Sequence, residues 1–210
     1  MHASHAGLGF DDMMSRNQVW VLTRLKVEID QYPAWNDRLN LQTWSRGNEG
    51  IFYLRDFIIQ DKNDNTIIRA TSSWAAINIK TRRPELVDGL EIKLYSQKDR
   101  IALDTRLEKL PLLKNKTLLK EYEVQYTDID IVYHVNNVKY IEMLINAFPL
   151  EQHKTNKVKS LEVNYLGETG YGEIMQIFTD DNYTEQAGQL VNIVRKSDQK
   201  EVCRARLIWT

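Results

Sequence analysis

Apolar and polar residues alternate along two blocks of the chain that lie about 136 positions apart. In the first block, Leu25, Val27 and Ile29 are separated by charged residues, and in the second, Leu161 and Val163 are separated by a glutamate. A period of two residues is typical of strands that bury one face. Each block therefore predicts a half-buried strand, and the shared offset indicates that the chain contains a repeat.

Each of these strands is followed by a further strand and then by a hairpin. The turns, DKNDN in the first block and KSDQ in the second, carry the residue types that tight turns need. The final strands share the pattern R-A-x-x-x-W, which starts at Arg69 and again at Arg204. The same strand order in both blocks indicates a duplication. The matched segments are 39–43 with 175–179, 51–60 with 189–195, and 66–77 with 201–209.

Between the two blocks, residues 81–116 are rich in lysine and leucine and contain two prolines. We interpret this stretch as the connection between repeats, with some helix in it. A strand is expected at 118–126, followed by a helix over 136–148 that begins with an asparagine N-cap at Asn136 or Asn137. The helix prediction rests on the apolar spacing of Val138, Ile141, Leu144 or Ile145, and Phe148.

Each repeat is thus predicted to be an α+β unit in which a long antiparallel sheet wraps one helix. The predicted organisation is a first repeat over 1–80, a connection over 81–116 and a second repeat over 117–210. Shifting the second repeat back by about 136 positions places the first helix at about 0–12 and its preceding strand ahead of Met1. Either the first repeat is naturally abbreviated or the chain is shortened. We favour a shortened chain, because a missing strand exposes sheet edge and core.

Composition narrows the classes of function. The 28 basic and 29 acidic residues are interspersed, so nothing predicts a nucleic-acid partner. No apolar run approaches the roughly 20 residues of a membrane helix, so no membrane span is expected. A single cysteine, Cys203, excludes an internal disulfide and suggests a reducing, cytoplasmic location. We predict Cys203 to be a small core residue, and we predict no cofactor and no metal, since His2 and His5 lack nearby carboxylates.

The candidate chemistry lies just before the second helix, where Asp130 and His134 are four residues apart. Backbone N–H groups at a helix start are unpaired and can stabilise an oxyanion. A histidine beside them can polarise the same oxygen or transfer a proton near neutral pH. The pair therefore suggests a site that acts on a carbonyl group.

The segment D-I-D-x-x-x-H-V-N-N-V-K-Y-I-E, which starts at Asp128, resembles the acyl-acyl carrier protein (ACP) thioesterases. That family carries D-x-N-x-H-V-N before a helix. Other segments are also similar to the family, and together they extend from about Ala3 to Trp209. The resemblance implies a double hotdog, with two tandem helix-in-sheet units. These other segments are NQVWVLTRLKVEI, LQTW, LRDFII, RATSSWAAINIKTRRP and LEVNYLGETGYGE.

The resemblance also implies roles for individual residues. Asp130 and His134 match the family's aspartate and histidine, and Glu168 matches its catalytic glutamate. Glu168 is then expected to be the general base for water. His134 and the helix amides would stabilise the carbonyl, and Asp130 would order His134 or water. One position departs from the family: Val132 stands where the family has asparagine, and valine offers no side-chain hydrogen bond.

The resemblance implies an acidic ACP as partner, with its fatty acyl chain held by the first repeat. The implied reaction releases free fatty acid and so terminates fatty acid synthesis. An acyl-CoA hydrolase of the hotdog class and a catalytically impaired acyl-binding or ACP-binding protein remain alternatives. Chain-length preference and further homodimerisation stay open. The residues considered for ACP contact are Arg82, Arg83, Lys109, Lys114, Lys116, Lys120 and Lys154–Lys159, and the tryptophans expected in the core or acyl pocket are Trp20, Trp35, Trp44 and Trp74.

Overall fold

The computed structural model describes residues 4, 7–87, 96–181 and 188–210. The chain divides into two compact units, a first unit of Met1–Leu107 and a second unit of Glu108–Thr210. The division falls inside the stretch 81–116 that the sequence assigns to the connection. No helix in the described part of the chain is long and apolar enough to cross a membrane.

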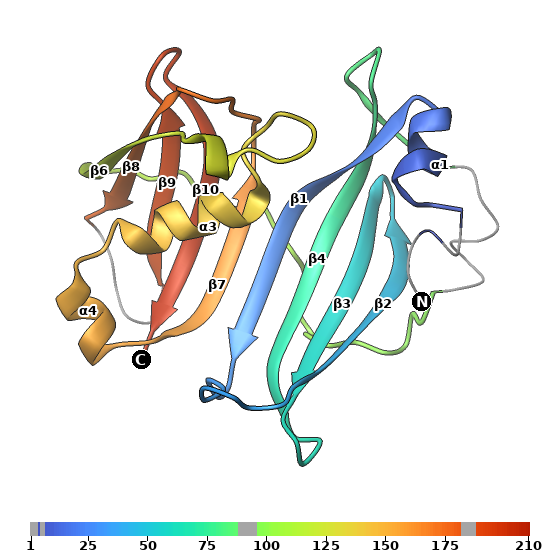
Figure 1. The fold of residues 1–210 in the computed structure, drawn as a ribbon, viewed down its shortest axis with the longest axis horizontal. Helices are drawn as coiled ribbons and strands as arrows, with labels where there is room; N and C mark the ends of the chain where they lie inside the picture. The colour runs from blue at the N-terminus through green and yellow to red at the C-terminus, as the bar shows by residue number, and fades with distance from the viewer. Residues whose placement is uncertain (1–3, 5–6, 88–95, 182–187) are drawn as a thin grey trace. The chain divides into compact units, whose positions relative to one another are not determined.

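The first unit is an antiparallel sheet in the strand order β2-β3-β4-β1, with the short β5 paired to β4 (Figure 1). The hairpin of β3 and β4 turns at Asp61, whose carboxylate accepts hydrogen bonds from the amides of Asn63 and Asn65. The predicted strands are therefore present. Their bounds are β1 Gln18–Ile29, β2 Asn40–Glu49, β3 Phe52–Gln60, β4 Thr66–Asn78 and β5 Pro84–Glu85.

One face of this sheet is covered by the short helix α1 (Phe10–Ser15). Met13 of this helix packs in a buried cluster with Tyr53 and Ala76, and Trp20 and Trp74 pack against the cluster. The first helix was expected at about 0–12 and is found slightly later, at Phe10–Ser15. Residues 1–3 and 5–6, which belong to the expected range, lie outside the described residues. The expectation that Trp35 is buried is wrong, because its side chain lies in a loop between strands and is 94% exposed.

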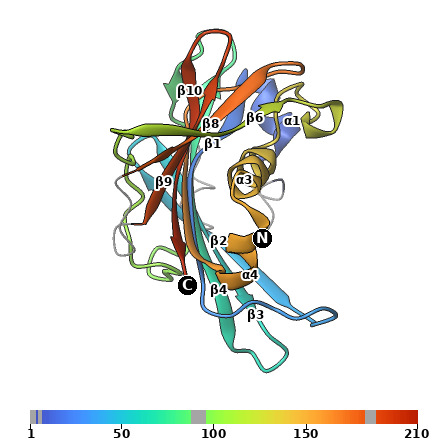
Figure 2. The same cartoon turned by 90° about the vertical axis from the view of Figure 1, so that its left-hand side faces the viewer.

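The opposite face of the sheet is crossed by residues 96–107, which we call the strap; Figure 2 shows it on the other side of the strands from α1. Trp44 donates its indole N–H to the carbonyl of Arg100 at 2.7 Å. The buried carboxylate of Asp56 accepts the amide of Ala102, also at 2.7 Å. The helix predicted within 81–116 is absent from the described residues of that stretch, where backbone groups bond to the sheet instead.

The second unit has the strand order β7-β10-β9-β8-β6, and the helix α3 lies across one face of this sheet (Figures 1 and 2). A 3₁₀ turn, η2, precedes α3, and a short helix, α4, follows it. The strand predicted at 118–126 is found slightly earlier. The bounds are β6 Lys116–Glu123, η2 Tyr126–Asp128, α3 Asn137–Asn146, α4 Leu150–Thr155, β7 Val158–Tyr165, β8 Ile174–Asp180, β9 Gln189–Arg195 and β10 Lys200–Trp209.

The core of the second unit lies between α3 and the sheet. Tyr140, Met143 and Leu144 form the buried face of the helix. Val138 was expected on that face but is 58% exposed, because it follows the N-cap on the solvent side of the first turn. Cys203 is fully buried in the same core, as predicted, and burial raises the pKa of its thiol.

Candidate active site

Asp130 and His134 lie in a tight loop between η2 and α3. The amide of Asp130 donates to the carbonyl of His134 at 2.9 Å, and the amide of Tyr133 donates to the carbonyl of Asp130 at 3.0 Å. Tyr133 has a φ of +63°, a left-handed conformation that closes the turn. The backbone on either side is paired by a bridge between Ile129 and Val135. The loop that carries His134 is therefore ordered by its own backbone.

The carboxylate of Asp130 faces the backbone of this loop. Its Oδ1 atom accepts the amide of Val132 at 3.0 Å and the amide of His134 at 3.4 Å. This arrangement is the Asx turn that an aspartate forms with residues following it. The carboxylate of Asp130 therefore bonds to the backbone and not to the His134 ring, which contacts Glu168. Asp130 thus acts on the position of His134 through the backbone, and the side chain of Val132 is 43% exposed at the turn.

Asn136 is the N-cap of α3. It is one of the two residues, Asn136 and Asn137, that were predicted for this position. Its side-chain oxygen accepts the amide of Val138 at 2.9 Å, and its carbonyl accepts the amide of Lys139. Its own amide donates to the carbonyl of Asp128, which fixes η2 against the helix start. Two amides of the first turn are thus occupied by the cap. The amide of Asn137 is the one that the cap does not use, so it is the helix group left for a substrate oxygen.

The structure brings His134 and Glu168 together, although 34 positions separate them in the sequence. Nε2 of His134 lies 3.8 Å from Oε2 of Glu168, and both side chains are 41% exposed. The amide of Val135 donates to the carbonyl of Thr169 at 2.9 Å, which holds the two loops side by side. The distance is within ion-pair range but longer than a hydrogen bond. Both groups remain accessible to a substrate.

Other residues support the Glu168 loop, and the sequence did not single them out for this. Arg195 donates to the carbonyl of Glu168 at 2.9 Å and is itself held by Asp198. Tyr140 donates to the carbonyl of Gly167 at 3.4 Å. Burial raises the pKa of Tyr140 to about 12, so its hydroxyl remains a donor at neutral pH. The ion pair of Arg195 and Asp198 could have been predicted from the sequence, because the two residues stand three positions apart across the β9–β10 turn.

A cavity of about 190 Å³ lies along α3. Its walls include Tyr122, Asp128 and Lys139, but neither His134 nor Glu168. Asp128 is 3% exposed and accepts hydrogen bonds from the Tyr122 hydroxyl and the Gln125 amide, both at 2.8 Å. Burial, followed by the bond to Asp128, raises the pKa of Tyr122 to about 12. The cavity therefore has a fixed polar wall, but it does not contain the candidate catalytic pair. His2 and His5 lie outside the described residues.

Comparison with known proteins identifies the family. The sequence-family model for the acyl-ACP thioesterase N-terminal domain matches residues 1–93. The family model for the acyl-ACP thioesterase C-terminal domain matches residues 113–210. An acyl-ACP thioesterase of Bacteroides thetaiotaomicron has a solved structure that is 31% identical, with a TM-score of 0.82, and the match covers 100% of this chain and 84% of that one. The chain belongs to the acyl-ACP thioesterase family. The double-hotdog fold implied by the resemblance is confirmed.

Plant members of the family are similar along the whole chain. A chloroplastic palmitoyl-acyl carrier protein thioesterase of Arabidopsis thaliana is 33% identical over 100% of this chain and 56% of its own length. The 12:0-ACP thioesterase of Umbellularia californica has the same fold, with a TM-score of 0.82 at 24% identity over 100% of this chain and 84% of that one. The chain thus spans about half the length of the curated plant relatives it matches.

Proposed function

We propose that this chain hydrolyses the thioester of fatty acyl-ACP to free fatty acid and ACP. The observation that carries the proposal is the contact of His134 with Glu168, at 3.8 Å, beside the start of α3 in a member of the acyl-ACP thioesterase family. We further propose that the reaction ends fatty acid synthesis. The single buried cysteine supports a reducing compartment, and a cytoplasmic location stays a prediction, because the plant relatives are named as chloroplastic.

The proposed reaction places water between Glu168 and the thioester carbonyl. Glu168 takes a proton from water as the new C–O bond forms. His134 and the Asn137 amide donate hydrogen bonds to the carbonyl oxygen as it becomes an oxyanion. The tetrahedral intermediate then collapses, the C–S bond breaks and the pantetheine sulfur leaves. A thiol has a pKa of about 8.5, so the leaving group needs little help from an acid.

Asp130 is proposed to be a positioning residue that holds the His134 loop. Asp130→Asn keeps an oxygen that can accept the amides of Val132 and His134, whereas Asp130→Ala removes it. We expect Asp130→Asn to retain most of kcat and Asp130→Ala to lower kcat by about tenfold or more, with KM nearly unchanged. Steady-state kinetics of the two variants are the measurement. Equal losses in both variants would show that the charge of Asp130, and not its loop contact, matters.

The proposed partner is an acidic ACP, whose approach would be steered by exposed basic groups. The basic residues considered for this contact are exposed in both units, so they are available to a partner. We keep the proposal that the first unit receives the acyl chain and the second carries the catalytic residues. Whether two copies of the chain associate is left to a measurement of mass in solution.

The test of function is thiol release from ACPs that carry short to long acyl chains, with the matching acyl-CoAs beside them. We expect turnover that prefers ACP and that falls by at least about a hundredfold in His134→Ala. Cys203 is fully buried, so the enzyme adds little thiol background. Preference for CoA would favour the acyl-CoA hydrolase. Binding without turnover, unchanged by His134→Ala, would favour an impaired binding protein, and Val132→Asn would then test whether the missing amide is the cause.

A further inference from the structure

A cavity in the first unit lies on the strap side of the sheet. Its volume is about 800 Å³, which is within the usual range for small-molecule sites. The sheet side of the lining comes from strands β1, β2, β3 and β4, and residues 103–107 of the strap form one wall. The apolar part of the lining is formed by Ile51, Phe52, Leu54, Leu103 and Leu107.

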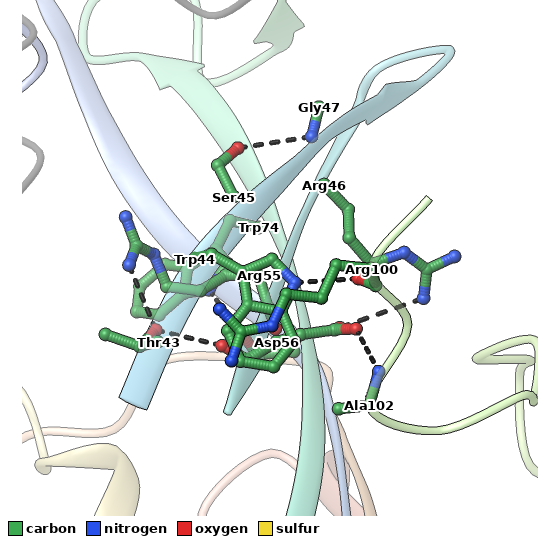
Figure 3. Close-up of polar contacts among 11 residues, drawn as sticks. Thr43, Trp44, Ser45, Arg46, Gly47, Arg55, Asp56, Trp74, Arg100 and Ala102 are labelled. Carbon is green, nitrogen blue, oxygen red and sulfur yellow. Dashed lines mark hydrogen bonds and ion pairs between the residues drawn. The ribbon is translucent and has the colours of Figure 1, made fainter. Parts of the chain in front are cut away.

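The strap side of the sheet is rigidly built, so the cavity has a fixed wall. Figure 3 shows Asp56 directed at the amide of Ala102 and toward the guanidinium of Arg46. The Arg46–Asp56 distance is 3.7 Å, and the carboxylate of Asp56 is fully buried. Trp44 bonds to the Arg100 carbonyl and stacks under the Arg100 guanidinium at 3.8 Å. These contacts hold the strap over the sheet through groups of the chain itself.

Two polar groups in the lining lack the partners that burial normally requires. Thr71 is 1% exposed, lines the cavity, and its hydroxyl has no hydrogen-bond partner among the described residues. Arg24 is half-buried and forms no ion pair with a described carboxylate. One of its N–H groups donates to the Leu107 carbonyl at 2.6 Å, and its guanidinium lies over the Phe52 ring. A guanidinium has five N–H donors, so most of them remain for a ligand.

The charges around the cavity restrict the ligand. Arg24 and Arg46 are half-buried inside it, whereas Glu49, Asp104 and Arg106 are exposed at its rim. Asp56 already offsets the charge of Arg46, which leaves Arg24 as the half-buried cation of the lining without a carboxylate partner among the described residues. The two rim carboxylates, offset only by Arg106, disfavour ligands of high negative charge, and the apolar lining favours an alkyl chain. A singly charged carboxylate with a linear alkyl chain satisfies both conditions.

We propose that this cavity is a second binding site, which takes a fatty carboxylate. The head group accepts hydrogen bonds from Arg24 and Thr71, and the alkyl chain lies along Phe52, Leu54 and Leu103. The site lies in the first unit, whereas His134 and Glu168 lie in the second, so it is separate from the hydrolytic residues in the chain. The proposal does not depend on thioesterase activity, because it concerns binding of the free carboxylate.

The test is photolabelling of the full chain with dodecanoic acid that carries a diazirine on its alkyl chain, followed by peptide mapping. We expect label in the peptides that contain 51–54 and 103–107, and little label there from the methyl ester of the same probe. Arg24→Met is expected to lower this labelling by about tenfold. Arg38→Met, an exposed arginine outside the cavity, is the matched control and is expected to have no effect.

Two further variants keep the test decisive if Arg24→Met disturbs the strap. Thr71→Val removes a hydroxyl that has no protein partner, so it leaves the fold intact and lowers labelling several-fold. Leu54→Trp fills the groove and abolishes labelling of 51–54 and 103–107. Labelling confined to the second unit, or equal labelling by acid and ester, would overturn the proposal. Glu168→Gln is expected to label like the parent chain, so failure of hydrolysis and failure of this site are distinguishable.

Discussion

Replacing Glu168 by glutamine is expected to reduce hydrolysis of acyl-ACP by about a hundredfold to ten-thousandfold, the usual contribution of a general base. Glutamine keeps the size of the side chain and the contact distance to His134, but it cannot take a proton from water. The loss is expected in kcat, with KM nearly unchanged, because the substitution leaves the binding surface in place. Single-turnover release of the ACP thiol is the measurement.

Glu173→Gln is the matched control for this substitution. Glu173 lies five positions further along the same connection between β7 and β8, and its carboxylate accepts the hydroxyl of Ser197 rather than facing His134. We expect its activity to stay within about twofold of the parent chain, since surface changes of this kind alter the free energy of unfolding by no more than about 0.5 kcal/mol. An equal loss in both variants would contradict a base role for Glu168 and point to the loop as a whole.

The double variant Glu168→Gln with His134→Ala sharpens the assignment. Residues that act as one unit show strongly non-additive losses, because removing the second adds little once the first is gone. We expect the double variant to be scarcely slower than the slower single one. Additive losses would mean that His134 and Glu168 contribute independently, which their contact at 3.8 Å does not suggest.

The parts of this architecture that the sequence predicted are those set by local physics. Alternation in Leu161 and Val163 requires a strand that buries one face, and Asn136 is a strong N-cap wherever a helix follows it. The exposure of Val138 was missed because helical spacing alone does not show which of two adjacent faces meets the sheet. Trp35 was misplaced because a large aromatic usually means core, but this one lies in a loop.

The site was only partly predictable for a similar reason. Asp130 and His134 stand four residues apart, so their proximity follows from the chain itself, whereas the meeting with Glu168 needed the resemblance. The sequence could not show that Asp130 would turn toward backbone amides, since aspartate can bond equally well to a ring or to a turn. The support from Arg195 depends on the pairing of β9 with β8 and β10, which is a tertiary contact.

Identical residues at equivalent positions of the two repeats differ in burial and in their contacts. Arg69 and Arg204 occupy the same position in the pattern R-A-x-x-x-W. Arg69 is 37% exposed and pairs with the exposed Asp30. Arg204 is 2% exposed, pairs with Glu201 through two nitrogens, and donates to the carbonyl of Leu110. The arginine is present on both strands, but only in the second unit is it buried, beneath the segment around Leu110 through which the chain enters that unit.

Arg204→Met is expected to lower the free energy of unfolding by about 3–5 kcal/mol, because the carbonyl of Leu110 loses its donor and the partly buried carboxylate of Glu201 keeps only the side-chain amide of Asn192. Arg69→Met, the same substitution at the repeat-equivalent position, is expected to cost about 1 kcal/mol or less, since exposed ion pairs contribute little. Urea unfolding of both variants, compared with the parent chain, is the measurement. Equal costs would show that burial of Arg204 does not set its importance.

The double variant Arg204→Met with Glu201→Leu distinguishes the loss of the Arg204–Glu201 ion pair from the cost of leaving the Glu201 charge without its partner. If most of the cost is the carboxylate of Glu201 that has lost its ion pair, removing that carboxylate recovers much of the stability, because apolar side chains of similar volume often replace a charged pair without loss. The carbonyl of Leu110 remains without its donor in both variants, and the amide of Asn192 loses its acceptor in the double variant, so recovery is expected to stop about 1–3 kcal/mol short of the parent chain. A double variant no more stable than Arg204→Met would show that the charge left on Glu201 is not the cost, and would place it in the neutral hydrogen bonds of Leu110 and Asn192.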